Sequence, residues 1–231
     1  MVVALAAEAQ ALLSRRLPLG TVERCQPGLS VQVCGMGPRA AAAAARALAD
    51  SGVQALAMFG IAGALDPQLK SGALLCPPQV VAEDGGRYRA DPSWRARLAA
   101  RLGGIGLDDG ILLTVREPLL TPQSKEAARR RFDACAVDME SSAVAEVAQS
   151  RGLPLLVLRA IADGAGDAIP LPLAAAIDRW GRPRPLGVAA ALLRRPQLVS
   201  RLPHLAGTMN RATAALRGAV QAAGPTLAFP T

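Results

Sequence analysis

Short apolar runs alternate with amphipathic stretches along most of the chain. Helices are predicted at residues 8–16, 39–50 and 92–102; the last is amphipathic, whereas 39–50 is rich in alanine and has almost no distinct apolar face. Apolar runs that predict strands cover residues 2–6, 29–34, 55–59, 73–81, 111–115 and 155–158. This alternation predicts an α/β fold with a mixed, mostly parallel sheet and helices on its faces.

Residues 137–163 combine one predicted helix with one predicted strand. Gly152 followed by Pro154 ends the helix, because glycine tolerates a left-handed cap and proline cannot continue the turn. The run at 155–158 is apolar without alternation, which is typical of a strand covered on both faces. The helix itself is indicated by the helical spacing of Ala143, Val144, Val147 and Ala148.

Acidic residues lie at both ends of this stretch. Asp138 and Glu140 precede the helix, and Asp163 follows the strand. Ligands of open α/β sheets bind beyond the carboxyl ends of strands, so these carboxylates are candidate site residues. Two structural alternatives stay open: Asp163 as a cap or turn residue, and Glu140 as a charge that complements the helix dipole.

The sequences VDMESSA at 137–143 and RAIAD at 159–163 resemble motifs of the nucleoside phosphorylase and nucleosidase superfamily. Residues 60–72, beginning Gly-Ile-Ala-Gly-Ala-Leu, resemble its glycine-rich stretch. Within it the chain looks closest to methylthioadenosine/adenosylhomocysteine nucleosidases and to the hopanoid-associated phosphorylase branch. The resemblance implies a three-layer α/β/α sandwich with a mixed central sheet, and a homodimer.

The resemblance also implies roles for individual residues. In such proteins the Met-Glu pair lies under the ribose, which implies that Met139 and Glu140 bind the sugar. The Asp of the second motif protonates the purine N7, which implies that Asp163 is the catalytic acid. A Glu in the first strand-to-helix turn activates the attacking water, which implies Glu8, with helix-dipole pairing as its alternative. Such carboxylates match the charges that develop when an N-glycosidic bond breaks.

The remaining substrate contacts are implied by the same motifs. Many relatives carry Ser or Thr at the position of Ile61, whose side chain can donate no hydrogen bond. This departure argues against phosphate binding by that route. Phosphate stays an alternative as co-substrate, and no other cofactor is expected. The predicted substrate-binding set, beyond the Met-Glu pair, is Asp138, Gly60, Ile61, Ala62, Gly63 and Arg159.

Composition adds limits to this picture. A chain of 231 residues with 51% hydrophobic residues is predicted to form one domain, residues 1–231. Its four cysteines have no metal-ligand spacing, so no metal site is expected. The net charge is +8 and nearly all of the positive charge is arginine, with only Lys70 and Lys125 as lysines. Basic residues are not interleaved with aromatic ones, so nucleic acid is not expected and the arginines are interpreted as scattered surface charges.

The C-terminal part of the chain is predicted to be a helical extension, residues 186–223, after a short helix near 173–180. This tail resembles the hopanoid-associated branch. The implied substrate is then adenosylhopane, an adenosine joined through its 5′ carbon to a polycyclic lipid. An apolar strip beside arginines is predicted to contact an anionic membrane, with packing on the sheet as the alternative: Leu198, Leu202, Leu205 and Met209.

The N-terminus lacks a positive segment before a long apolar one, and no apolar run reaches the ~18 residues that span a bilayer. We therefore expect a cytoplasmic protein with peripheral contact at the inner membrane. The predicted function is release of adenine from a 5′-substituted adenosine. A phosphate-dependent purine nucleoside phosphorylase and a methylthioadenosine/adenosylhomocysteine nucleosidase are the catalytic alternatives, and a non-catalytic nucleoside-binding protein is the alternative from another class.

Overall fold

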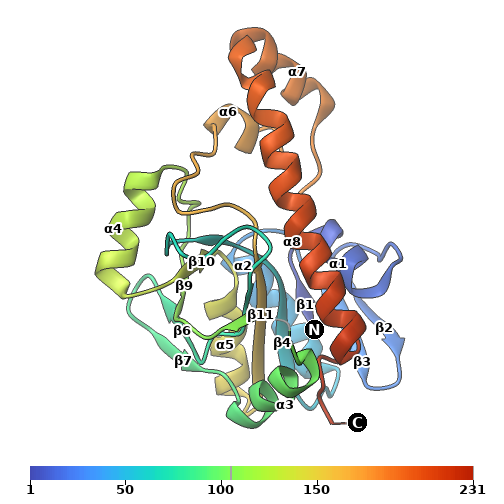
Figure 1. Ribbon diagram of the computed structural model, residues 1–231. Coiled ribbons are helices and arrows are strands. Elements are labelled where there is room, and N and C mark those ends of the chain that lie inside the picture. The colour runs from blue at the N-terminus through green and yellow to red at the C-terminus, as the bar shows by residue number, and fades with distance from the viewer. Residues whose placement is uncertain (105, 231) are drawn as a thin grey trace.

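The computed structural model describes residues 1–104 and 106–230, and Ile105 and Thr231 lie outside this part. The described residues form one mixed sheet with helices on both faces (Figure 1). The predicted three-layer α/β/α sandwich is therefore confirmed. The strands are β1 (Val2–Val3), β2 (Val22–Gln26), β3 (Leu29–Val33), β4 (Leu56–Ala64), β5 (Leu74–Leu75), β6 (Gln79–Ala82), β7 (Arg87–Arg89), β8 (Leu107–Asp108), β9 (Leu112–Thr114), β10 (Ala136–Asp138) and β11 (Leu155–Ile161).

The helices follow the predicted alternation with the strands. They are α1 (Ala6–Leu13), α2 (Pro38–Asp50), α3 (Pro92–Leu102), α4 (Pro122–Phe132), α5 (Ser141–Ser150), α6 (Leu171–Ala174), α7 (Pro185–Arg194), the short 3₁₀ helix η1 (Pro196–Arg201) and α8 (Leu202–Ala223). Proline in the first turn of several of them occupies a position where the helix has no hydrogen-bond partner for a backbone N–H. The segment at 186–223 is helical as predicted and contains most of α7, with η1 and α8, while the division into domain and extension stays a prediction.

β4 is the strand around which the sheet is built. Its residues 56–62 pair in parallel with β11, Met58 also pairs in parallel with β1, and its last two residues pair antiparallel with β10. Alternate residues of β4 and β11 therefore face opposite layers. Met58 and Val157 pack under α2 and α5, while Phe59 and Leu158 pack under α1, α3 and α8. This double burial explains why both strands are apolar without alternation.

Helix α8 extends beyond the sheet. Its C-terminal half packs on the sheet through Ala212, Leu216 and Ala219, whereas its N-terminal half leads away to α7 and η1 at the tip of the molecule (Figure 1). We call residues 171–201, which hold α6, α7 and η1, the tip lobe. The lobe has a small apolar cluster of its own around Leu173 and Leu198. Across the described residues, none of the helices has both the length and the apolar content to cross a membrane.

Several local predictions were wrong. β4 continues through the glycines at 60–63, which had been placed after the strand. The charged segment at 84–89, for which no strand was predicted, contains β7, which closes a hairpin with β6. The short helix near 173–180 is instead α6, which ends at Ala174. In each case hydrogen bonds to another segment fix the conformation, and the local apolar pattern does not show them.

Candidate active site

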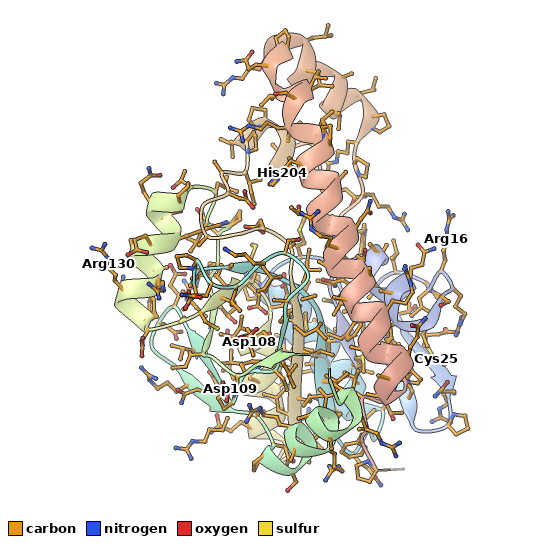
Figure 2. All side chains as sticks on the ribbon, in the orientation of Figure 1. Arg16, Cys25, Asp108, Asp109, Arg130 and His204 are labelled. Carbon is orange, nitrogen blue, oxygen red and sulfur yellow. The ribbon has the colours of Figure 1, made fainter. Side chains whose placement is uncertain are left out.

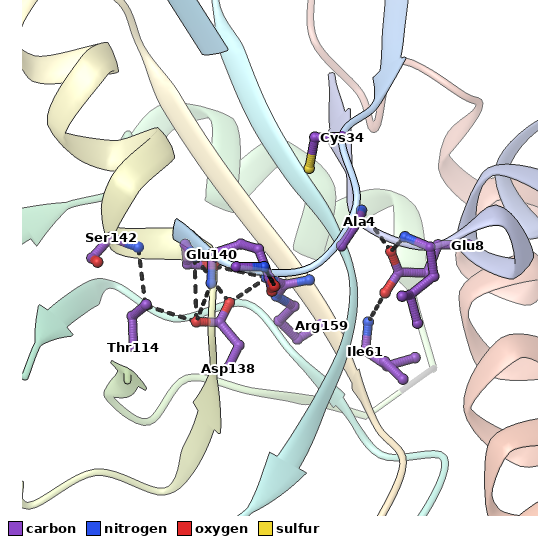
Figure 3. A network of polar contacts seen from close by, with 12 residues as sticks. Ala4, Glu8, Cys34, Ile61, Thr114, Asp138, Glu140, Ser142 and Arg159 are labelled. Atoms are coloured by element: carbon purple, nitrogen blue, oxygen red, sulfur yellow. Dashed lines mark hydrogen bonds and ion pairs between the residues drawn. The ribbon is translucent and has the colours of Figure 1, made fainter. Parts of the chain in front are cut away.

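Glu8 lies in the first turn of α1 and is almost completely buried, at 1% exposure. Its Oε2 accepts hydrogen bonds from the N–H groups of Ala4 and Leu5 at 2.9 and 2.8 Å, and its Oε1 accepts one from Ile61 N–H at 2.8 Å. Burial raises the pKa of Glu8, although Arg159 and these N–H groups oppose the rise. Glu8 therefore fastens the β1–α1 turn to β4 in one fixed orientation (Figure 3).

Arg159, on β11, is the centre of a buried charge cluster. Its Nη2 forms an ion pair with Asp138 and lies 3.6 Å from Glu140 Oε2. Burial would lower the pKa of Arg159, but the charges of Asp138, Glu140 and Glu8 together raise it. Its Nε and Nη1 have no hydrogen-bond partner within the described structure. The guanidinium is held in the core by three carboxylates that surround it.

Asp138 directs its contacts to protein groups. It accepts a hydrogen bond from Thr114 Oγ1 at 2.7 Å, and its oxygens lie 3.2 and 3.3 Å from Ser141 N–H at the start of α5. Together with its ion pair to Arg159, these contacts hold the helix end on the sheet. Substrate contact by Asp138 stays a prediction, since its observed role is to anchor its neighbours.

Glu140 is the residue just before α5 and is 6% exposed. Its Oε1 accepts a hydrogen bond from Gly37 N–H at 2.8 Å, across 103 positions in the sequence. Burial, followed by the charge of Asp138, raises the pKa of Glu140 to about 7, against the effects of Arg159 and Gly37. The alternative that Glu140 only complements the helix dipole fits this geometry poorly, because the side chain is held by Gly37 and the charge cluster.

Asp163 follows β11 and forms an ion pair with Lys125 of α4. The Lys125 side chain is 1% exposed, and its Nζ also donates to the carbonyl oxygens of Gly164 at 2.7 Å and Asp167 at 3.3 Å. Burial raises the pKa of Asp163, while Lys125 opposes the rise. The Asp163 side chain remains 17% exposed, so it is the most accessible of the candidate catalytic carboxylates.

The glycines of β4 let these side chains approach the strand. A Cβ on Gly60 would clash with Glu8 Oε1 and lie 2.6 Å from Arg159 Nη1. A Cβ on Gly63 would lie 3.1 Å from Asp163 Oδ2. The glycine-rich stretch thus makes room for acidic side chains from other elements, a role that its sequence alone did not reveal. Of the other predicted site residues, Ile61 and Met139 are half-buried and Ala62 is buried.

A turn between α6 and α7 lies against the strand-to-helix turns that carry Glu8 and Gly37. Trp180 O accepts a hydrogen bond from Ala6 N–H at 3.2 Å, and Arg179 O accepts one from Met36 N–H at 2.8 Å. A cavity of about 440 Å³ lies beside the loop that follows Asp163, between that loop and α8. A larger cavity of about 980 Å³ is lined by the start of β3 and β4, so it lies at the end of the sheet away from the candidate site.

Sequence reasoning missed Lys125, Thr114 and Gly37 as partners of the acidic residues. For Lys125 a signal was present, since it is one of two lysines in a chain that otherwise uses arginine. Thr114 and Gly37 are common residues in ordinary contexts, and only the fold brings them to Asp138 and Glu140.

A sequence profile described as the phosphorylase superfamily matches residues 14–194 of the chain. The chain belongs to this superfamily. A 5′-methylthioadenosine/S-adenosylhomocysteine nucleosidase of Geobacillus kaustophilus is 32% identical over 128 residues, which cover 47% of this chain and 54% of the relative. An aminodeoxyfutalosine nucleosidase of Helicobacter pylori is 30% identical over 134 residues, covering 50% of this chain and 58% of the relative.

This superfamily member therefore spans little more than half the length of these curated relatives. Its fold extends further than the sequence match. A mutant of Helicobacter pylori MTAN with 5′-methylthioadenosine in the active site superimposes with a TM-score of 0.68, covering 95% of this chain and 96% of the other. With 21% sequence identity, this likeness establishes the shared fold.

Proposed function

We propose that the protein is a nucleoside N-glycosidase that releases adenine from a 5′-substituted adenosine. The observation that carries this proposal is the placement of carboxylates along the end of β4. Glu8 and Glu140 lie at the Gly60 end of the glycine-rich stretch, and Asp163 lies over Gly63. Gly60 and Gly63 are three residues apart along β4, which corresponds to about 10 Å of strand between the two groups of carboxylates. The two sequence relatives described above are both nucleosidases by name, which supports the same reaction class.

In the proposed reaction a water oxygen bonds to C1′ of the ribose while the C1′–N9 bond breaks. The electron pair of that bond goes to the purine, and Asp163 donates a proton to N7, so adenine leaves as a neutral base. Glu8 accepts a proton from the attacking water. Both carboxyl groups have a raised pKa because they are buried, so each holds a proton at higher pH than an exposed carboxyl group does. Glu140 accepts hydrogen bonds from the ribose hydroxyls.

Hydrolysis is favoured over phosphorolysis in this proposal. The Ile61 side chain offers no donor to a phosphate oxygen, and its N–H already donates to Glu8. Arg159 is buried in its own ion pairs and is not placed to bind a free anion. Water is therefore the better match as nucleophile.

The finer part of the proposal concerns the 5′ group. We propose adenosylhopane, whose polycyclic lipid lies in a bilayer, as the substrate. The tip lobe supports this, because its exposed leucines follow closely after the loop that carries Asp163. The proposal includes a cytoplasmic location with peripheral contact at the membrane, which such a substrate requires.

The test is adenine release from adenosylhopane and from methylthioadenosine, each with and without phosphate. Release without phosphate is expected, and faster turnover of adenosylhopane. Release only with phosphate would make the protein a phosphorylase, and binding without release would make it a nucleoside-binding protein. Asp163→Asn should lower kcat about a hundredfold or more. Asp50→Asn, which removes the charge of a side chain that is 61% exposed, should leave kcat unchanged.

A further inference from the structure

The excess positive charge is concentrated in the C-terminal part of the chain. Residues 168–231 contain eight arginines and one acidic residue, Asp178, so this segment carries +7 of the net charge of +8. The arginines themselves are spread along the chain, since 16 of the 24 lie in residues 1–167, and the asymmetry comes from the scarcity of acidic residues after residue 167. Arginine usage alone does not explain the asymmetry, because residues 1–167 balance 18 basic residues with 17 acidic ones.

Exposed apolar side chains gather in the same part of the molecule. Among the described residues, the only exposed large apolar side chain outside the tip lobe is Met36, which is 39% exposed. The exposed fractions within the lobe are larger, reaching 87% at Leu186 and 83% at Leu193. The full set in the lobe is Leu171, Ile177, Leu186, Leu193 and Val199.

Helix α7 presents a defined apolar stripe to solvent. Leu186, Ala190 and Leu193 are spaced by four and three residues, so they lie on one helix face, and all three are exposed. The inward face is already occupied, since Ala191 packs in the lobe cluster with Leu198. The predicted lipid-contacting strip was wrong in its residues, because Leu198 is 7% exposed and Leu202 and Leu205 pack against it.

Arginines flank this stripe at both ends of α7. The exposed residues Arg182 and Arg184 precede the helix, and the exposed residues Arg194 and Arg195 end it. The chain contains no acidic residue after Asp178. Exposed leucines with arginines beside them match a surface that is apolar inside and anionic at its boundary.

We propose that this face of α7 docks the protein on an anionic phospholipid bilayer. Leu186 and Leu193 insert among the acyl chains, and the flanking arginines contact lipid phosphates. A second copy of the chain fits less well, because a twofold interface would bring the same arginines of both copies together. Nucleic acid would match the arginines but leave the leucines in water.

The docking face is linked to the candidate active site. Residues 162–170 connect β11 to α6, so Asp163 and the lobe share one short segment. His204 lies at the start of α8 (Figure 2), and its Nε2 is 3.1 Å from Asp167 Oδ1 of that segment. A docked lobe would therefore hold the site close to the bilayer, which, if the proposed function holds, is where a lipid-linked nucleoside is found.

The test is co-sedimentation of the full chain with vesicles of phosphatidylcholine, with and without phosphatidylglycerol. Binding is expected only with phosphatidylglycerol, and it should weaken as salt increases. Leu186→Ser/Leu193→Ser should weaken binding at least tenfold. Arg194→Gln/Arg195→Gln should weaken it severalfold.

The matched control is Arg130→Gln/Arg131→Gln on α4, which removes the same charge away from the lobe (Figure 2) and should bind as the unmodified chain does. Equal loss in this control, or binding that survives the leucine changes, would overturn the proposal. If the unmodified chain does not bind vesicles, and the leucine changes break a dimer, the face would be assigned to self-association instead. Adenine release from methylthioadenosine without vesicles separates failure of docking from failure of the proposed catalysis.

Discussion

At the scale of single residues, the candidate site depends on buried carboxylates whose charge is set by one or two partners. Asp163 is paired with Lys125, and Glu140 is held between Gly37 and Arg159. Each pair joins segments far apart in the sequence. Changing one partner should therefore alter the protonation of the other in a direction that the geometry fixes.

Lys125→Met should change the pH dependence of turnover. Loss of the ammonium raises the pKa of Asp163 further, because burial is then unopposed by its main partner. An acid with a higher pKa stays protonated to higher pH, so the alkaline limb of kcat/KM should move upward. We also expect kcat to fall about tenfold as Asp163 loses its fixed orientation. The control Lys125→Arg keeps the charge and should leave the alkaline limb of kcat/KM in place. If the limb does not move in Lys125→Met, Lys125 has only a structural role.

Glu140→Gln should change how stability depends on pH. The folded state raises the pKa of Glu140 from 4.5 to about 7, so it binds this proton more tightly than the unfolded chain does. The ionised form is therefore disfavoured by folding, and the contribution of Glu140 to stability falls as pH rises between these values. Relative to the Gln variant, the unmodified chain should lose up to about 3 kcal/mol between about pH 5 and pH 8. Urea unfolding at several pH values measures this, and a difference that is constant with pH would contradict it.

At the scale of elements, β4 and its glycines decide where the carboxylates lie. Gly60→Ala should destabilise the protein by about 1–3 kcal/mol, because the new methyl group meets Glu8 and Arg159 in a packed interior. Gly218→Ala is the control: a Cβ there meets no atom within 4 Å, and the change in helix α8 should be neutral or stabilising by up to about 1 kcal/mol. Urea unfolding provides the measurement. In the double variant Gly60→Ala/Glu8→Ala, the loss in free energy of unfolding should be smaller than the sum of the losses in the two single variants. Full additivity would show that the clash is not with Glu8.

Much of the sandwich could be predicted from sequence, because apolar runs and helix stops are local signals. The strands at 29–33, 56–59 and 155–158 and helix α3 at Pro92–Leu102 were found in this way. Short strands such as β7 and β8 were not, since they exist only through pairing with a neighbour. The acidic site residues were found from motifs, whereas the ion pair of Lys125 spans 38 positions and depends on how α4 packs.

At the scale of the whole molecule, a compact body continues into a basic, partly apolar tip lobe. The lobe is attached by more than its chain connections, because Trp180 O accepts a hydrogen bond from Ala6 N–H and Arg179 O one from Met36 N–H. The two tryptophans report on different places: Trp94 belongs to α3 in the body, and Trp180 lies where the lobe packs against the core of the body. The homodimer implied by the sequence stays a prediction, as does the single domain.

If residues 1–231 form one cooperative domain, both tryptophans should report the same unfolding transition. Trp94→Phe leaves Trp180 as the fluorescent reporter, and Trp180→Phe leaves Trp94. Urea midpoints from fluorescence should match the midpoint from circular dichroism within each variant. A Trp180 signal that changes at lower urea than the helical signal would show that the lobe unfolds separately.

The contact of Gly60 with Glu8 and Arg159 also constrains how this chain can change by mutation. Any residue with a side chain at position 60 becomes acceptable only after Glu8 or Arg159 has become smaller. A descendant that lost the proposed reaction would be free to lose these charges first and fill the space afterwards. The reverse order passes through an unstable intermediate. A descendant sequence without this glycine would therefore indicate that Glu8 or Arg159 was replaced before the glycine was.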